Sequence, residues 1–198
     1  VVVQRFRKLS SVPLNGGGVG KIFLGEDREV PRRIAVKELN SQLAGVPKQR
    51  LALEFEARLT GALQHPGVPP IYGLGKHVDG RPFFAMLLIE GDTFHHKIRC
   101  YHSVDREEQD DRLDCREDER PTSPEERRMA FRRLLRHFID VCDVMEYAHS
   151  RQIIHRDLKP GNVMIGRHGE TYRIHRRMAG TLQAAKGGSV ETDEPTPI

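Results

Sequence analysis

The chain has 198 residues, 37% hydrophobic and 30% charged, which is enough for one soluble globular domain or most of a larger one. Its 32 lysines and arginines are interspersed with 28 aspartates and glutamates, so no basic block favours nucleic-acid binding. The sequence contains no run of about 18 apolar residues that would cross a membrane. The first ten residues hold too short an apolar run for a signal peptide.

The first part of the chain alternates short apolar runs with turn signals. Residues 6–39 contain two such runs around the glycine cluster in VPLNGGGVGKIFLGED, followed by RRIAVKEL, a pattern typical of a β-hairpin and a third strand. In LALEFEARLTGAL, Leu51, Phe55, Leu59 and Leu63 recur every four residues and predict an amphipathic helix. Two apolar runs around VDGR predict another hairpin. Five strands and one helix thus form a small α+β unit.

A charged stretch follows at residues 105–128, with eleven acidic and six basic side chains and almost no apolar ones. This composition predicts a solvated insertion, and a docking loop is the functional alternative. A helix is expected next, because Ser123 suits the N-cap, Pro124 the first helical position and Glu126 the end of an S-x-x-E capping box.

One face of this long helix is predicted to be buried along its whole length, with its Cys and Met as core residues. Its members are Phe131, Leu135, Phe138, Cys142, Met145 and His149. After the helix, two apolar runs around GRHGE predict a further hairpin.

Three cysteines, Cys100, Cys115 and Cys142, have neither C-x-x-C spacing nor a nearby pattern of metal ligands. Their odd number and spacing argue against a disulfide framework and against a zinc site. We therefore expect a reducing environment and a cytoplasmic location.

The segment HRDLKPGN, residues 155–162, carries the strongest chemical signal. Phosphoryl transfer needs an oriented acceptor hydroxyl, charge stabilisation on the transferred phosphate and a held metal ion, and the H-R-D-L-x-x-x-N spacing supplies a group for each. Asp157 would accept or orient the hydroxyl proton, Lys159 would neutralise the γ-phosphate, and Asn162 would hold one Mg²⁺. The alternative is a plain turn with a His-Arg pair, but eight matching residues rarely arise by chance.

Roughly residues 6 to 174 resemble the eukaryotic-like serine/threonine protein kinases of bacteria, most closely in EARLTGALQHPG, YGLGKHVDGRPFFAM and YAHSRQIIHRDLKPGNVM. The resemblance implies an α+β, protein-kinase-like fold, with a complete β-rich N-lobe and hinge at 1–91 and an incomplete helical C-lobe at 92–174. It also implies transfer of the γ-phosphate of ATP to protein Ser/Thr hydroxyls with Mg²⁺, because Lys159 is typical of Ser/Thr kinases. The oligomeric state is left open.

The resemblance also implies an ATP site. Gly17 and Gly20 match the second and third glycines of G-x-G-x-x-G, and Asn15 stands in the first place, where it tolerates left-handed backbone conformations. IAVK makes Lys37 the ligand of the α- and β-phosphates, and Glu56 is its expected ion-pair partner. The adenine site would further use Ile22, Ala35, the gatekeeper Met86, the backbone of Leu87 and Ile89, and Met164. Considered alone, each of these residues could instead be an ordinary core or surface residue.

The family's second metal-binding residue, an aspartate, is expected near position 175, but the sequence there reads TYRIHRRMAG, with His175 in its place. An imidazole beside two guanidiniums is a poor site for Mg²⁺, which prefers oxygen ligands. Residues 175–198 are predicted to be a disordered, non-kinase tail, because no activation segment follows and Gly, Ser, Thr, Glu and Pro dominate.

Three interpretations follow from this end of the sequence. The chain is a working kinase completed by other parts, or an inactive pseudokinase or nucleotide- or protein-binding module, or the product of a gene truncated or frame-shifted after about residue 174. The abrupt loss of resemblance favours the last. Without the later C-lobe helices, the long helix is expected to have apolar surface without an evident partner.

Overall fold

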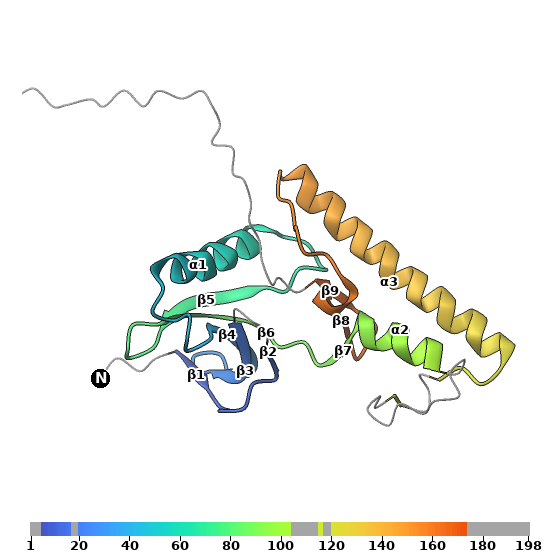
Figure 1. Cartoon of the computed structure of the whole chain (residues 1–198), viewed down its shortest axis with the longest axis horizontal. Helices are drawn as coiled ribbons and strands as arrows, with labels where there is room; N and C mark the ends of the chain where they lie inside the picture. The colour runs from blue at the N-terminus through green and yellow to red at the C-terminus, as the bar shows by residue number, and fades with distance from the viewer. Residues whose placement is uncertain (1–4, 17–19, 104–114, 117–119, 174–198) are drawn as a thin grey trace, which may run out of the picture.

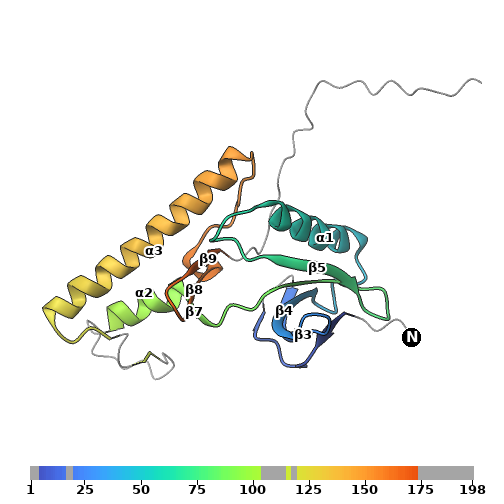
Figure 2. The same ribbon diagram turned by 180° about the vertical axis from the view of Figure 1, so that it is seen from behind.

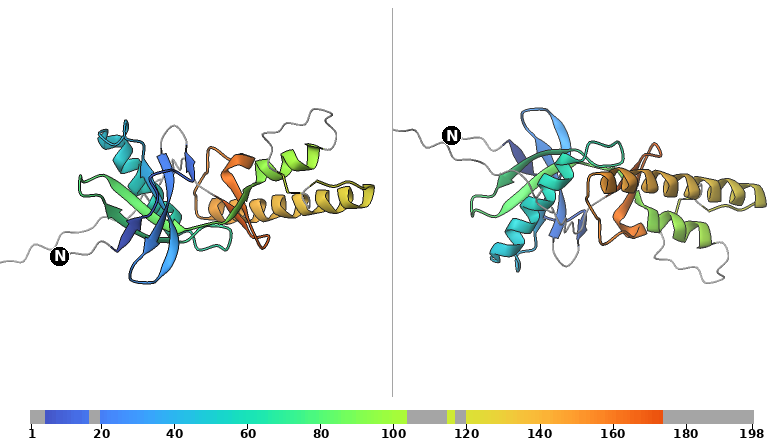
Figure 3. Two further views of the ribbon diagram at one scale, coloured as in Figure 1. Left: turned by 90° about the horizontal axis from the view of Figure 1, so that it is seen from below. Right: turned by 90° about the horizontal axis from the view of Figure 1, so that it is seen from above.

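The structure, a computed structural model, describes residues 5–16, 20–103, 115–116 and 120–173. One part consists of a β-sheet with helix α1, and the other of helices α2 and α3 with a small second sheet (Figure 1). Seen from below and from above, the two parts lie side by side (Figure 3). This arrangement agrees with the predicted β-rich lobe followed by a partial helical lobe.

The larger sheet is antiparallel, with the order β1-β3-β4-β6-β5 and with β2 also paired to β3. Its strands are β1 (Phe6–Lys8), β2 (Asn15–Gly16), β3 (Gly20–Asp27), β4 (Arg32–Leu39), β5 (Ile71–Lys76) and β6 (Pro82–Leu87). Because β1 and β2 pair with successive parts of the same strand, they act as two pieces of one interrupted edge strand. The predicted five-stranded sheet is therefore present, with its first strand divided.

Strand β4 lies at the centre of this sheet and has apolar residues on both faces. Side chains alternate along a strand, so Ile34 and Val36 face one side and Ala35 the other. Ile34 and Val36 pack with Phe6 of β1, whereas Ala35 belongs to a second cluster that contains residues of α1. Burial on both faces explains the unbroken apolar run in RRIAVKEL.

Helix α1 (Pro47–Ala62) covers one face of the sheet. The predicted helix is present, but part of its predicted buried face is wrong, because Leu51 is 67% exposed. The buried positions are Leu53, Glu56, Ala57, Leu59 and Thr60. Apolar spacing alone missed this face because it includes an alanine, a threonine and a glutamate.

The second part begins with β7 (Gly91–Thr93) and α2 (Phe94–His102) and continues with α3 (Pro124–Ser150), the short 3₁₀ helix η3 (Pro160–Asn162), β8 (Val163–Gly166) and β9 (Thr171–Arg173). Strand β8 lies between β7 and β9, and β8 and β9 form the predicted hairpin. Within the described part of the chain, no helix has the length and apolar character that a membrane crossing requires.

Helix α3 begins at the predicted capping box. The Ser123 side chain accepts a hydrogen bond from the Glu126 backbone N–H at 3.2 Å, and the Glu126 carboxylate accepts one from Ser123 N–H at 3.2 Å. Residues 124–128, predicted as the end of the charged insertion, are therefore helical. Residues 104–114 and 117–119 of that insertion lie outside the described residues.

The predicted buried face of α3 is wrong except at Met145, which is half-buried and packs against the cluster that contains Val141. Phe138 is 56% exposed and Cys142 is exposed as well, whereas Val141, Val144 and Ala148 are buried. Their neighbours are α2, the β8 hairpin and the segment after α1, and α2 lies beside α3 in views from front and behind (Figures 1 and 2). The helix has two adjacent apolar stripes, and only tertiary partners decide which one is buried. The expected exposed apolar surface is present.

The interpretation of the cysteines is also wrong, because Cys100 and Cys115 form a disulfide with a Cα–Cα distance of 5.8 Å. Cys100 lies on α2 and Cys115 in a loop 15 residues later, a pairing that their spacing did not indicate. The cysteines therefore give no support to a reducing environment. His175 and the predicted tail lie outside the described residues.

We expect Val144→Ala to lower the free energy of unfolding by about 2 kcal/mol, because it deletes a fully buried side chain. Phe138→Ala on the same helix should change it by less than about 0.5 kcal/mol. Urea unfolding of both variants measures the two values. A larger loss for Phe138→Ala would mean that the sequence-predicted face is the buried one.

Candidate active site

A buried ion pair joins the sheet to α1. Lys37 lies on β4, opposite Ile22 of β3 and Phe84 of β6, and its Nζ donates a hydrogen bond to Glu56 Oε1 on α1. Each of the two side chains is only 9% exposed. The Lys37 Nζ also lies 5.6 Å from the centre of the Phe84 ring, an additional favourable site for a cation. The sequence-predicted partners are thus in contact.

Burial raises the pKa of the Glu56 carboxyl above its ordinary value, and the charge and hydrogen bond of Lys37 oppose that rise. Each partner therefore makes the burial of the other tolerable, since an isolated buried charge costs several kcal/mol. A buried ammonium held in this way is a fixed positive charge at the edge of the apolar cluster.

Three of the expected adenine-site residues are close together. Ala35 and Met86 are opposite one another on β4 and β6, and both belong to the apolar cluster against which Ile22 packs. Gly20 begins β3, and an added Cβ there would lie 2.9 Å from the Glu38 carbonyl oxygen. Glycine therefore lets the backbone pass close to β4. Gly17 lies outside the described residues.

The other expected adenine-site residues lie outside that cluster. Leu87 ends β6, and its N–H donates to the Pro70 carbonyl at 3.0 Å. This N–H is therefore already used within the protein. Ile89 is half-buried in the link to β7, and Met164 is half-buried on β8 opposite Thr93.

The segment HRDLKPGN forms the loop between α3 and β8. Asn162 is 2% exposed and anchors this loop, because its Nδ2 donates to the Asp157 carbonyl at 2.7 Å and to Asp157 Oδ2 at 3.0 Å. Arg156 has a φ of 62°, a left-handed conformation that is uncommon for residues other than glycine. This turn brings Asp157 back over the buried asparagine.

Asp157 is the exposed member of the group. Its side chain is 36% exposed, and Lys159 Nζ lies 3.1 Å from its Oδ1. The hydrogen bond from Lys159, followed by that from Asn162, holds the pKa of Asp157 below its ordinary value, although desolvation opposes the shift. The carboxylate is therefore ionised at neutral pH, accessible to solvent and held in one orientation by an amide and an ammonium.

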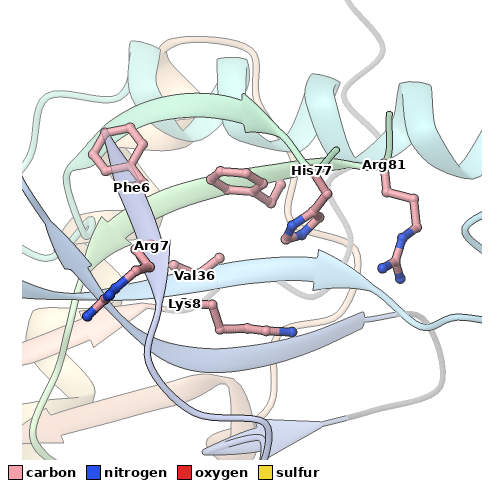
Figure 4. Close-up of a pocket in the computed structure, with 7 residues that line it drawn as sticks. Phe6, Arg7, Lys8, Val36, His77 and Arg81 are labelled. Carbon is pink, nitrogen blue, oxygen red and sulfur yellow. The ribbon is translucent and has the colours of Figure 1, made fainter. Parts of the chain in front are cut away.

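A separate cavity of about 150 Å³ lies on the face of the sheet away from α1. It has basic side chains from β1 and the β5–β6 turn, including Lys8, His77 and Arg81 (Figure 4). The Glu38 carboxylate contacts Lys8 at 2.9 Å and His77 at 2.7 Å, so it already balances part of this charge. Sequence reasoning did not identify the cavity, and none of the expected site residues lines it.

Comparisons with known proteins agree with this geometry. The family model described as protein tyrosine and serine/threonine kinase matches residues 10–177. Over 154 residues the chain is 34% identical to the serine/threonine-protein kinase PknD of Protochlamydia amoebophila, covering 78% of the chain and 14% of that protein. It is 31% identical over 183 residues to PknD of Chlamydia trachomatis serovar D, covering 92% and 18%. The chain thus spans less than a fifth of either relative's length.

A solved structure is similar in fold. The crystal structure of the Mycobacterium tuberculosis PknI kinase domain, determined for a point mutant, matches with a TM-score of 0.58 and 21% sequence identity. The match covers 88% of this chain and 60% of that one.

Glu56→Gln should lower the free energy of unfolding by about 3 kcal/mol, because it leaves the buried Lys37 ammonium without a charged partner. The control is Glu54→Gln, the same chemical change at a half-buried position on the same helix, with less than about 0.5 kcal/mol expected. Urea unfolding at neutral pH compares them. Equal effects would argue against a stabilising role for the pair.

Proposed function

Because the chain belongs to the protein kinase family, we propose that it binds ATP with Mg²⁺ and transfers the γ-phosphate to Ser or Thr hydroxyls of proteins. The observation that carries this proposal is the catalytic loop, in which an exposed, ionised Asp157 is held by Lys159 and the buried Asn162. Serine/threonine acceptors are supported by the names of the two relatives and by the lysine two residues after the aspartate.

The ion pair and the apolar cluster support the ATP site. Glu56 holds Lys37 through the hydrogen bond, and Lys37 would contact the α- and β-phosphates. Ile22, Ala35 and Met86 would contact the adenine ring, while the backbone of Leu87 and Ile89 would meet its polar edge. Gly17 and Gly20 would let the loop before β3 approach the phosphates. Met164 would form the floor of the adenine pocket.

The transfer step needs an acceptor hydroxyl that is oriented and loses its proton. The Asp157 carboxylate is ionised and exposed, so it can accept a hydrogen bond from that hydroxyl and then its proton. Lys159 stands beside the same carboxylate, where its ammonium can stabilise charge on the transferred phosphoryl group.

Among the described residues, Asn162 offers one ligand position that fits a magnesium ion. Both hydrogen bonds of the Asn162 amide use Nδ2, which leaves Oδ1 as an oxygen ligand of the kind that Mg²⁺ prefers. Bound Mg²⁺ would neutralise phosphate charge. The sequence places His175 where the family has a second, carboxylate ligand, and this residue lies outside the described part of the chain.

His175 favours a second candidate function, a module that binds nucleotide without transferring phosphate. Lys37, Glu56 and the apolar cluster do not depend on the metal, so nucleotide binding can persist where the metal is held poorly. The two candidates differ in one observable property, phosphate transfer by the unmodified chain.

We expect the chain to transfer ³²P from labelled ATP to a basic protein substrate, and Asp157→Asn to reduce the rate at least about 100-fold, because the variant cannot accept the hydroxyl proton. Asp143→Asn, an exposed aspartate on α3, is the matched control and should keep the wild-type rate. Phosphoamino-acid analysis of the product identifies the acceptor. Unchanged transfer by Asp157→Asn would refute the role of this residue.

ATP should raise the melting temperature of the chain, with a larger increase when Mg²⁺ is present, and Lys37→Met should abolish both increases. Thermal shift measurements with and without EDTA test this. Stabilisation that is independent of metal, in a chain that transfers no phosphate, would support the nucleotide-binding module and contradict the kinase proposal.

A further inference from the structure

A second group of chemically reactive side chains lies on and beside α2. The ligand atoms of His96, Cys100 and Cys115 all lie within 4.8 Å of one another. Cys100 is fully buried, and the other two residues are half-buried. No role in phosphate transfer has been assigned to these three residues.

The helix places two of these donors. Thr93 caps α2 by accepting a hydrogen bond from the His96 N–H at 3.1 Å, so the helix begins at a defined residue. His96 and Cys100 are four residues apart and therefore lie on one face. The His96 Nε2 is 3.4 Å from the Cys100 Sγ. A nitrogen and a sulfur bound to one tetrahedral zinc ion are about 3.5 Å apart, from bond lengths of about 2.0 and 2.3 Å.

The loop supplies the third donor. Cys115 is joined to Cys100 by the disulfide, and the next residue, Arg116, contacts Asp92 on β7 at 2.7 Å. Lys97 of α2 contacts the same carboxylate at 3.0 Å. Asp92 thus contacts both α2 and residue 116, so residues 115–116 are held beside the start of α2 by an ionic contact as well as by the disulfide.

We propose that, when the disulfide is reduced, His96, Cys100 and Cys115 bind one Zn²⁺ ion. Reduction by a thiol reductant adds two electrons and two protons, converting the S–S bond to two thiols and the reductant to its own disulfide. Zn²⁺ then replaces the two thiol protons and binds the two thiolates and the imidazole Nε2, with water in the fourth position. Thiolate and imidazole donors favour zinc over Mg²⁺ or Ca²⁺.

This site would hold Cys115 beside α2 in both redox states. The disulfide joins the two cysteines under oxidising conditions, and the metal would join the same two cysteines under reducing conditions. The inference does not depend on the proposed kinase function, because none of its three ligands is assigned to the ATP or catalytic residues.

The test uses the 198-residue chain reduced with a phosphine reductant, which does not supply competing thiolates, and Co²⁺ as a spectroscopic substitute for Zn²⁺. We expect one equivalent of Co²⁺ to bind, with a thiolate-to-cobalt charge-transfer band that one equivalent of Zn²⁺ removes. The oxidised chain should show no such band. Absence of the band in the reduced chain would overturn the proposal.

Variants assign the ligands. Cys115→Ser should abolish the thiolate band or shift it markedly, and His96→Gln should weaken Co²⁺ binding at least tenfold. Cys142→Ser and His95→Ala, both exposed in the structure, are the matched controls and should bind like the wild type. Far-UV circular dichroism checks that each variant is folded. Loss of binding in Cys142→Ser, or unchanged binding in folded Cys115→Ser and His96→Gln, would refute the assignment.

Discussion

The contact between Lys37 and Glu56 is the constraint on which the candidate site depends. Two opposite charges, each almost excluded from solvent, can remain buried only while they face one another. Because one is on the central strand β4 and the other on α1, this requirement fixes how the helix lies on the sheet. The apolar cluster that contains Ala35 and Met86 is packed in the same layer, so the charge and the apolar wall are positioned together.

The HRDLKPGN loop is held by a different kind of interaction. Asn162 is buried, and its amide group donates two hydrogen bonds to Asp157, one to the backbone and one to the side chain. A buried amide is costly unless such bonds are made, so the loop conformation that makes them is strongly favoured. The aspartate itself remains exposed, as the proposed contact with a substrate hydroxyl requires. Asp157 is therefore firmly held by Asn162 and still accessible to solvent.

The sequence predicted those features whose information is local. The S-x-x-E capping box, the VDGR hairpin and the HRDLKPGN loop each lie within a few residues, so their geometry follows from short-range chemistry. The pairing of Lys37 with Glu56 was also anticipated, but only from the resemblance to kinases. Periodicity could not choose between the Val144 and Phe138 faces of α3, because both stripes are apolar and the choice depends on neighbours distant in sequence.

The disulfide and the His96 donor were missed for a related reason. Cys115 lies beside α2 only in the tertiary structure, where the next residue, Arg116, contacts Asp92, a residue that no spacing rule connects to Cys115. Asp92 is opposite Ile165 in the pairing of β7 with β8, and β8 begins directly after Asn162. The strand that contacts the cysteine segment is therefore paired with the strand that follows the HRDLKPGN loop. The two candidate sites thus lie on neighbouring strands of the same small sheet, although they share no ligand.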